Sequence, residues 1–488
     1  MSTVAMSFSE RLEKPFAPLI SSQILKRWIL GVIVILCAFG NLPWNLDEYD
    51  QAKQAYVSYE IAQGGDWLYQ HVPRGGTATK PPLAGWISLA VYSFTGSWEL
   101  AWRLPGFLCS LVLLALLMRE GRSMLPDGGA LLAAAAFGLN FLTPRVSTLV
   151  RTDMMLTLWI FLCGWLILRK IRDGSEWEMS ERWMFALAML AALLTKGPII
   201  YAFLIPGIVA YAVLAPRGER GRVWSGWWTW VLPLAVFLVW GVYGLMTNRE
   251  FYNDVVVREF FSRFDQSLKA HERQQPIWFY FPHLIHKFLP WSLLVMALPL
   301  ASRNVRTAIR RDPATLWLLC WALGGLVCMT VIPSKRVDRI YPVIPPFCLL
   351  VVAMVAACRC GTRVRAWVGA AMVFALIFWG AYFAGIVWIG YHEKSARLVT
   401  LGNAVRDLST GRSLGVVAGN DEGLILYTDG KKFLRPEDAA QAWNEKKIDA
   451  LFVSERLLAA FRDLPPPVLE EVGKREKRYF LFLRAPSP

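Results

Sequence analysis

Two adjacent carboxylates, Asp47 and Glu48, are the residues of this chain best placed for acid–base chemistry. They follow directly after the first long apolar segment, 28–42. A carboxylate at a membrane boundary is costly when it faces lipid, so it normally faces water or a protein-lined cavity. From such a position it can take a proton from the hydroxyl or phosphate of an acceptor molecule. An acidic helix cap or a structural ion pair is the alternative explanation.

Charged residues also stand at later boundaries between apolar and polar sequence. Lys80 precedes two prolines, which lack a backbone donor and hold the entry to the following helix rigid. A fixed ammonium there suits a lipid phosphate, although a lysine stem lying along apolar surface is the alternative. Arg151, Asp153 and Lys196 bracket short turns, and Asp153 in isolation is also a favoured helix cap.

Two loops interleave basic and aromatic residues. The longer loop, 247–283, contains Arg258, Glu259 and Arg263 among several Phe and Tyr residues. This mixture suits a phosphate head beside an apolar chain, and an aromatic interfacial belt is the alternative. A second basic cluster needs an anionic ligand if it lies on the outer side of the membrane. That cluster, in 334–346, contributes Lys335, Arg336, Arg339 and Tyr341.

The composition predicts a polytopic α-helical membrane protein. The chain has 488 residues, of which 55% are hydrophobic and only 18% are charged, and its mean hydropathy is +0.37. The net charge of +15 would favour a nucleic-acid partner if it were concentrated in one patch. Much of it lies instead in short loops between apolar runs, where it sets membrane orientation and meets anionic lipid, so no nucleic-acid partner is expected.

Eleven transmembrane helices are expected. The run 81–95 is too short for the usual span of about 20 residues, so we interpret it as an interfacial helix on the outer face. Five short basic loops then face the cytoplasm, as the positive-inside rule requires, and all five would face outward if 81–95 crossed. The expected spans are 28–42, 101–118, 129–146, 152–169, 183–196, 198–215, 227–246, 284–301, 314–332, 341–357 and 366–389.

This topology predicts three regions. Residues 1–27 form a cytoplasmic N-terminal segment that ends in Lys26-Arg27, typical of an uncleaved signal anchor. Residues 28–390 form the membrane domain, and 391–488 form a small soluble α/β domain on the outer side. In that domain we expect strands at 413–418, 450–453 and 479–483 and helices at 436–446 and 455–461. The acidic pair, Lys80, Asp153, Lys196 and the 335–341 segment all reach the outer face.

Neither the cysteines nor the histidines predict a metal centre. Most of the eight cysteines lie inside apolar runs, where a small buried hydrophobe is the simplest explanation. The five histidines lack the spacing of a metalloenzyme. The sequence therefore predicts no definite cofactor. A divalent metal at either of two acidic sites, Asp47-Glu48 or Asp153, stays open.

Taken together, an ordered set of motifs over residues 28–350 resembles the GT-C membrane glycosyltransferases. The resemblance is strongest to the lipid A aminoarabinose transferases and their protein O-mannosyltransferase relatives. The motifs are Asp47-Glu48, Gly65-Asp66-Trp67, Lys80-Pro81-Pro82, Arg103-Leu104-Pro105, Asp153, Lys196-Gly197-Pro198, Phe251-Tyr252, Arg263-Phe264, Pro276-Ile277-Trp278-Phe279-Tyr280, Leu289-Pro290-Trp291 and Lys335 with Tyr341-Pro342.

The resemblance implies a GT-C fold in the bacterial inner membrane. It also implies an inverting transfer of a sugar from a polyprenyl-phosphate donor to a lipid, glycan or protein acceptor on the periplasmic face. Asp47 would be the catalytic carboxylate, with Glu48 beside it. The expected donor-phosphate contacts are Lys80, Arg263, Lys335, Arg339 and Tyr341. The expected cavity-lining residues are Arg151, Asp153, Lys196, Arg258 and Glu259.

Several positions depart from the resemblance. An Arg-Tyr that usually follows the Asp-Glu pair is replaced by Asp50-Gln51, and an aromatic-x-Lys-Pro pattern becomes Ala78-Thr79-Lys80-Pro81. A Glu-His pair becomes Glu259-Phe260, and eleven spans replace thirteen. These changes surround the site, so the sugar and the acceptor can differ from aminoarabinose and lipid A.

Two other classes of function compete with this interpretation. A secondary transporter or flippase-like protein would need charged or broken helices near the bilayer midplane, and usually internal repeats. Here the charges cluster at one face and no repeat is found. A scaffold subunit with a decayed site would tolerate changes at Asp47 and Lys80.

Overall fold

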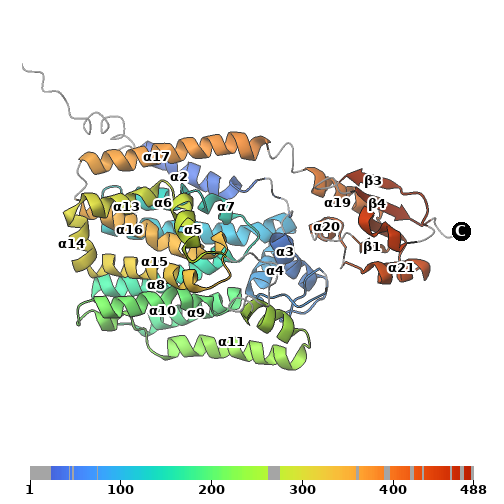
Figure 1. Ribbon diagram of the computed structural model, residues 1–488, viewed down its shortest axis with the longest axis horizontal. Coiled ribbons are helices and arrows are strands. Elements are labelled where there is room, and N and C mark those ends of the chain that lie inside the picture. The colour runs from blue at the N-terminus through green and yellow to red at the C-terminus, as the bar shows by residue number, and fades with distance from the viewer. Residues whose placement is uncertain are drawn as a thin grey trace, which may run out of the picture. The chain divides into compact units, whose positions relative to one another are not determined.

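The computed structural model (Figure 1) describes residues 23–42, 44, 46, 49–73, 75–261, 275–358, 362–389, 396–417, 423–430, 433–461, 464–472 and 478–484. The chain divides into two compact units. Unit 1 comprises Met1–Asn41, Arg103–Thr247 and Val256–Phe383, and unit 2 comprises Leu42–Trp102, Asn248–Val255 and Ala384–Pro488.

Unit 1 is a bundle of apolar helices. Their sequences are rich in Leu, Val, Ile, Phe and Trp, and nearly all lack the charged face that a soluble surface helix carries. Those lying wholly or mostly in the unit are α2 (Gln23–Phe39), α5 (Trp98–Met124), α6 (Gly129–Gly138), α7 (Thr143–Ser147), α8 (Asp153–Asp173), α9 (Met179–Lys196), α10 (Ile199–Leu214), η1 (Arg220–Val223), α11 (Trp228–Thr247), η2 (Tyr252–Phe260), η5 (Ile277–Phe279), α12 (Tyr280–Lys287), α13 (Trp291–Ala301), α14 (Arg303–Arg311), α15 (Pro313–Val331), η6 (Val337–Val343), α16 (Ile344–Ala357) and α17 (Thr362–Tyr382).

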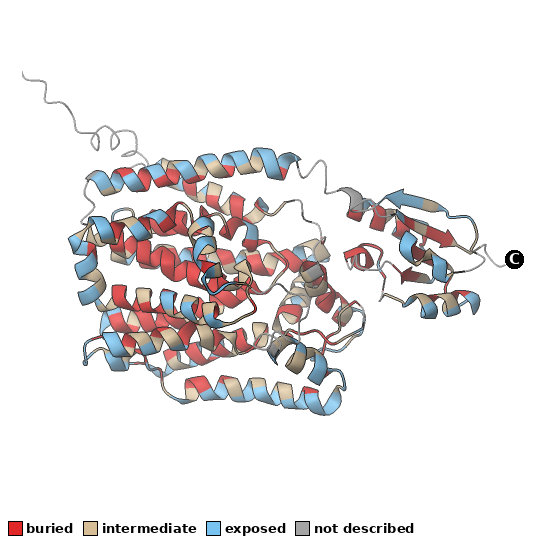
Figure 2. Ribbon diagram, viewed as in Figure 1, coloured by how far each residue is buried: buried red, intermediate tan, exposed pale blue. Residues whose placement is uncertain are grey.

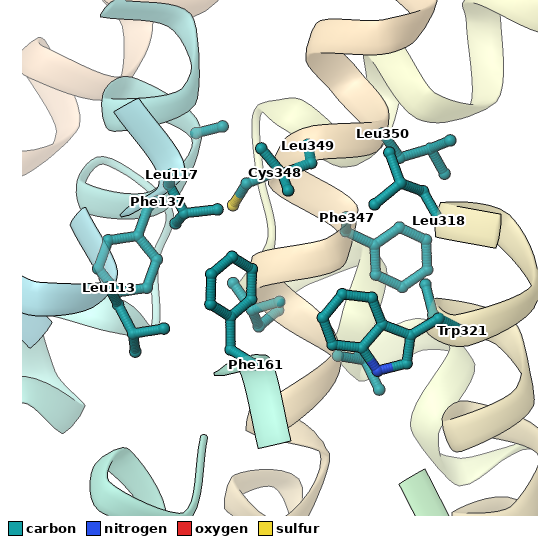
Figure 3. Close-up of a cluster of buried hydrophobic side chains, with 14 of the residues drawn as sticks. Leu113, Leu117, Phe137, Phe161, Leu318, Trp321, Phe347, Cys348, Leu349 and Leu350 are labelled. Atoms are coloured by element: carbon teal, nitrogen blue, oxygen red, sulfur yellow. The ribbon is translucent and has the colours of Figure 1, made fainter. Parts of the chain in front are cut away.

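The interior of unit 1 is built on α8 and α16, which are buried along nearly their whole length (Figure 2). Phe161 of α8, Trp321 of α15 and Phe347 of α16 point into this core (Figure 3). By contrast, α11 and α17 lie on the outside of the unit and expose large apolar side chains to the surroundings. Exposed apolar faces of this length belong in lipid.

The apolar helices identify a multi-pass membrane protein, but the structure does not confirm eleven crossings. Each of the eleven expected segments contains a helix. Among the described residues, six helices are long and apolar enough to cross a membrane, or seven if the bent pair Ile277–Lys287 and Trp291–Ala301 is one span. The other segments are shorter helices, such as α10, or carry too many charges, such as α9.

The expected span 129–146 is wrong as a single helix, because Asn140 divides it into α6 and α7. The Asn140 side-chain amide donates to the carbonyls of Ala136 and Phe137 at 2.9 and 2.6 Å, which caps the end of α6. Its side-chain oxygen accepts from the backbone amides of Leu142 and Thr143 at 3.0 and 2.9 Å, which starts α7. A short polar side chain that satisfies both helix ends replaces the continuous ladder.

The segment 81–95 forms the short helix α4 (Leu83–Thr95), as expected. Pro81 and Pro82 precede it, and Gly96 ends it with a φ of +63°, a left-handed conformation that favours glycine. Its 13 residues rise only about 20 Å, less than the hydrocarbon core of about 30 Å.

Unit 2 combines the first polar loop, which lies within Leu42–Trp102, with the C-terminal region. A four-stranded sheet has the order β1-β2-β4-β3, with β1 and β2 parallel and the other pairs antiparallel. Ala450 of β2 pairs with Leu414 of β1 on one side and Leu483 of β4 on the other. The elements are α3 (Tyr49–Ala62), α4, η7 (Phe383–Trp388), α19 (Ala396–Leu408), β1 (Leu414–Val417), α20 (Gly423–Tyr427), α21 (Pro436–Asn444), β2 (Ala450–Ser454), η8 (Glu455–Ala460), β3 (Leu469–Val472) and β4 (Arg478–Leu483).

The expected strands and helices of the C-terminal region are present, but α19, α20 and β3 were not expected. The strand β3 has the sequence LEEV and is mostly exposed, so it lacks the apolar alternation of a half-buried strand. The helix α20 has only five residues, too few for a helical period to show in the sequence.

Close packing of α10 against α15 generates a prediction. A Cβ added at Gly324 would lie 2.5 Å from the backbone nitrogen of Gly207, so Gly324→Ala must push these helices apart. We expect a loss of about 1–3 kcal/mol, visible as a lower melting temperature in detergent. Gly241→Ala in α11 is the control, since its Cβ meets nothing within 4 Å. Equal melting temperatures for both variants would contradict the packing.

Candidate active site

In unit 1, a buried ion pair joins the start of α8 to the end of α9. Lys196 Nζ donates to Asp153 Oδ1, and the two side chains are only 7% and 5% exposed. Asp153 is the first residue of α8 and Lys196 is the last residue of α9, so the antiparallel hairpin brings them together. Gly197 then turns the chain into α10 with a φ of +74°, which strongly favours glycine.

A second ion pair ties the next turn to the same helix end. Arg151 donates from Nη1 to Asp338 Oδ2 at 2.9 Å, and Arg336 donates from Nε to Asp338 Oδ1 at 3.3 Å. Asp338 belongs to η6, whose neighbour is α8. Asp338 also lies close enough to Lys196 to interact with its charge. The two ion pairs therefore form one electrostatic network.

Two cations beside this network lack a carboxylate partner among the described residues. Arg339 donates from Nη1 to the carbonyl and hydroxyl oxygens of Ser334 at 2.6 and 2.8 Å, so its partners are neutral. Within the described part of the chain, Lys335 has no ion-pair partner, and burial lowers the pKa of its ammonium. Lys335 and Arg339 are therefore the two cations of this segment that have no carboxylate partner among the described residues.

The aromatic hydroxyls of this region support the segment from inside. Tyr280 accepts a hydrogen bond from the backbone amide of Arg336 at 3.2 Å. Tyr341 is fully buried, and its hydroxyl donates to Thr143 Oγ1 at 2.9 Å. In this geometry Tyr341 anchors η6 to α7. The phosphate contact expected of it stays a prediction.

In unit 2, the first polar loop presents Lys80 on a short two-stranded turn. His71 and Thr77 form an antiparallel bridge, and the amide of Ala78 donates to the carbonyl of Gln70 at 2.7 Å. Lys80 follows this turn, is half-buried and precedes α4. Asp47, Glu48 and Arg263 lie outside the described residues, so their expected roles stay predictions.

The same loop holds a carboxylate–imidazole pair that the sequence motifs did not indicate. Glu60 accepts from the His71 backbone amide at 2.6 Å, and its other oxygen lies 2.7 Å from His71 Nδ1. The hydrogen bond to Glu60 raises the pKa of His71. A protonated His71 therefore stabilises the loop below its ordinary pKa, and this contribution disappears as the pH rises through the raised value. Glu60 and His71 are 11 residues apart, a spacing that matches no motif, so the sequence did not predict this pair.

Two hydrogen bonds inside unit 2 join the start of the loop 247–283 to the first polar loop. Asp254 accepts from the backbone amide of Thr77 at 2.9 Å, and Asn248 donates from its side chain to the Thr77 hydroxyl at 3.1 Å. Arg258 and Glu259 follow in the π-helix η2, exposed and half-buried respectively. Sequence motifs singled out these last two residues but missed Asp254 and Asn248.

The structure thus gathers the expected residues into two sets. Unit 1 joins Asp153 to Lys196 in one ion pair and joins Arg151 and Arg336 to Asp338 in others, and Lys335 and Arg339 flank Asp338 in the same segment. Sequence analysis did not assign Asp338, although a lone acid within a basic run is a signal that could have found it. The convergence of this set with Lys80 stays a prediction. No group of three or more His, Cys, Asp or Glu side chains in the described parts of either unit could hold a metal ion.

Comparisons with known proteins agree with this architecture. Residues 79–243 match the family described as dolichyl-phosphate-mannose-protein mannosyltransferase. Among solved structures, the chain is similar to ArnT from Cupriavidus metallidurans bound to undecaprenyl phosphate, with a TM-score of 0.68 and 17% identity over 96% of this chain and 100% of that one. It is also similar to the oligosaccharyltransferase AglB from Archaeoglobus fulgidus, with a TM-score of 0.52 and 11% identity, covering 89% and 70% of the chains.

Curated relatives point the same way. The chain is 25% identical over 348 residues to an undecaprenyl phosphate-alpha-4-amino-4-deoxy-L-arabinose arabinosyl transferase from Pectobacterium atrosepticum, covering 71% of this chain and 60% of the relative. It is 27% identical over 319 residues to the enzyme of that name from Pseudomonas aeruginosa, covering 64% and 57%. The chain therefore spans about three fifths of the length of these relatives.

These findings confirm the resemblance to the aminoarabinose transferases and protein mannosyltransferases and establish the GT-C fold with a small C-terminal strand region. Together with the apolar helices, they indicate a multi-pass protein of the bacterial inner membrane.

The buried Asp153–Lys196 pair yields a stability prediction. Asp153→Asn leaves the Lys196 ammonium buried without its neighbouring counter-charge, and Lys196→Met leaves the Asp153 carboxylate in the same state. We expect each variant to lose about 3–5 kcal/mol, measured by thermal unfolding in detergent. The double variant should recover part of this loss, because no unpaired charge remains. Single variants that melt like the parent protein would show that the pair is not buried.

Proposed function

We propose that this chain is a glycosyltransferase that moves a sugar from a polyprenyl-phosphate donor to a lipid, glycan or protein acceptor. The reaction takes place on the periplasmic face, with the N-terminus in the cytoplasm and the C-terminal region outside. Lys335 and Arg339 carry the proposal, because two half-buried cations without a carboxylate partner among the described residues favour an anionic ligand. The fold shared with a transferase bound to undecaprenyl phosphate supports a lipid phosphate as that partner.

The chemical step is a displacement at the anomeric carbon of the sugar. An oxygen of the acceptor forms a bond to this carbon as the bond from the carbon to the donor phosphate oxygen breaks, with inversion. The acceptor proton passes to a carboxylate, which we assign to Asp47, with Glu48 beside it. The departing polyprenyl phosphate takes the electron pair and gains one negative charge.

Stabilising the departing phosphate is the task of the fixed cations. Lys335 suits this role because it is half-buried and lacks an ion-pair partner among the described residues. Arg339 is oriented by Ser334 through neutral hydrogen bonds, so its described partners bring no counter-charge. Preorganised cations contribute most where charge grows in the transition state. From the motif resemblance, Lys80 and Arg263 are proposed as further phosphate contacts.

The remaining expected residues take supporting roles. Asp153 and Asp338 hold Lys196 and Arg151 in place, which keeps the network rigid and limits its positive charge. Arg258 and Glu259 line the cavity in this proposal. Tyr341 fixes η6 from inside, through Thr143. A divalent cation, if transfer requires one, would bind at Asp47 and Glu48, and removal with EDTA followed by add-back tests this requirement.

The sugar and the acceptor are proposed only by class. The curated relatives are named as aminoarabinose transferases, and this chain spans about three fifths of their length. The departures at Asp50-Gln51 and at Ala78-Thr79 lie beside the proposed carboxylate and beside Lys80. A panel of polyprenyl-phosphate sugars, assayed by release of polyprenyl phosphate, identifies the donor.

The assignment of Asp47 predicts loss of transfer in Asp47→Asn. Removing the proton acceptor should lower kcat by about 10²–10⁴-fold, the usual contribution of a general base. The measurement is product formation by mass spectrometry with purified protein and a polyprenyl-phosphate sugar. Asp127→Asn in an exposed loop is the matched control and should retain full activity. A folded Asp47→Asn protein with parental turnover would overturn the assignment.

The assignment of Lys335 predicts weaker donor binding. Lys335→Gln removes a charged contact worth about 1.5–3 kcal/mol, so the KM for the donor should rise by about 10–100-fold. Arg310→Gln, an exposed residue of α14, removes the same charge elsewhere and should leave the KM unchanged. An unchanged donor KM in Lys335→Gln, in a protein that retains turnover, would remove this residue from the phosphate site.

A further inference from the structure

We propose that unit 1 binds the headgroup of an anionic phospholipid where α5 and α8 meet, at the end of α8 opposite the Asp153–Lys196 pair. The helix α8 has 21 residues, from Asp153 to Asp173. At about 1.5 Å per residue it is about 30 Å long, which matches the thickness of the hydrocarbon core. Its two ends therefore reach opposite membrane surfaces, so this site is separate from the proposed donor site.

The site is organised around Trp165 of α8, whose side chain is almost fully buried. Its indole Nε1 donates to Glu120 Oε1 of α5 at 2.9 Å. The Glu120 side chain is only 2% exposed, and its other oxygen accepts from Arg172. This carboxylate is therefore already paired with a cation, and the indole is fixed between the two helices.

Two guanidinium groups lie against this indole. The Cζ atom of Arg119 of α5 is 5.8 Å from the centroid of the Trp165 ring, and that of Arg169 of α8 is 5.2 Å away. Both distances are within the range of a cation–π interaction. The ring thus holds two positive charges from two helices beside one another at this end of the bundle.

The carboxylates near these two arginines are held by other cations. Arg169 is close enough to Asp173 and Glu181 to interact with their charges. Asp173, however, accepts from Arg172 Nε at 2.8 Å, and Glu181 forms a buried ion pair with Lys170. Within the described residues, neither of the two stacked arginines has an ion-pair partner of its own. Oriented guanidinium groups in this state favour an external phosphate.

An exposed apolar stripe on α5 favours a lipid as the source of that phosphate. Leu108, Val112 and Ala115 are exposed and lie three or four positions apart, so they share one face of the helix. Arg119 and Arg122 are also exposed and continue the same face for one more turn. An acyl chain lying along the stripe places its phosphate beside Arg119. Basic sites between helices at a membrane surface are typical recognition sites for anionic headgroups.

The test measures lipid retention by native mass spectrometry of the purified, delipidated full-length protein. Cardiolipin, phosphatidylglycerol and phosphatidylethanolamine are added separately at equal concentration. We expect the two anionic lipids to remain bound and phosphatidylethanolamine to be lost, because its ammonium group cancels the phosphate charge and faces the arginines. Equal retention of all three lipids would overturn the inference.

A matched pair of double variants tests the two arginines. Arg119→Gln with Arg169→Gln removes two charged contacts, so the affinity for phosphatidylglycerol should fall at least tenfold. Arg217→Gln with Arg310→Gln removes two exposed arginines elsewhere in unit 1 and should change this affinity less than twofold. An equal loss in both double variants would show unspecific attraction to the net charge and would overturn the inference.

Two further ligands distinguish this site from other phosphate binding. Glycerol 3-phosphate carries the headgroup phosphate without acyl chains and should not displace phosphatidylglycerol, because buried chain carbons contribute to lipid affinity. Displacement at equal concentration would overturn the assignment to a lipid. Undecaprenyl phosphate should bind the Arg119→Gln, Arg169→Gln protein within twofold of the parent, since its proposed cations lie elsewhere. Loss of this lipid as well would overturn a separate site.

Discussion

The structure of unit 1 depends on how charge is accommodated at one end of an apolar bundle. A charged group removed from water is tolerated only when it is paired or bound by polar groups. Lys196 satisfies this condition through Asp153, and Arg151 satisfies it through Asp338. Lys335 and Arg339, however, lie beside them without an ion-pair partner within the described residues. A site with this imbalance is best completed by an anion.

Helix geometry explains why the charges meet. The hairpin of α8 and α9 places a first residue beside a last residue, and η6 joins them where the chain enters α16. Each of these positions is a helix end, where side chains can extend beyond the lipid-facing surface of the helix and contact one another. The helices thus bring together charged residues that are far apart in the sequence, such as Arg151 and Asp338, which are separated by 187 positions.

Much of this arrangement could be predicted from the sequence, and the exceptions have physical causes. Each of the eleven apolar runs contains a helix, because lipid imposes one strong rule on composition, but the charged helix α14 (Arg303–Arg311) lay in a predicted loop. The sequence analysis did not predict the break at Asn140, because one side chain replaces several backbone hydrogen bonds without changing the hydropathy of the segment. It also did not predict the Glu60–His71 pair, because contacts of this kind leave no periodic pattern in the sequence. The motif resemblance named Lys335 and Arg339 but not Asp338, whose partners became visible only in three dimensions.

The central claim is that the uncompensated cations bind a lipid phosphate, and comparing two lipids by native mass spectrometry tests it most directly. Purified protein is incubated with undecaprenyl phosphate or with the uncharged alcohol undecaprenol at equal concentration, and the bound fraction of each is measured. The account predicts that undecaprenyl phosphate remains bound and that undecaprenol does not. Equal retention of the two lipids would contradict it, because an apolar groove alone would then explain the binding.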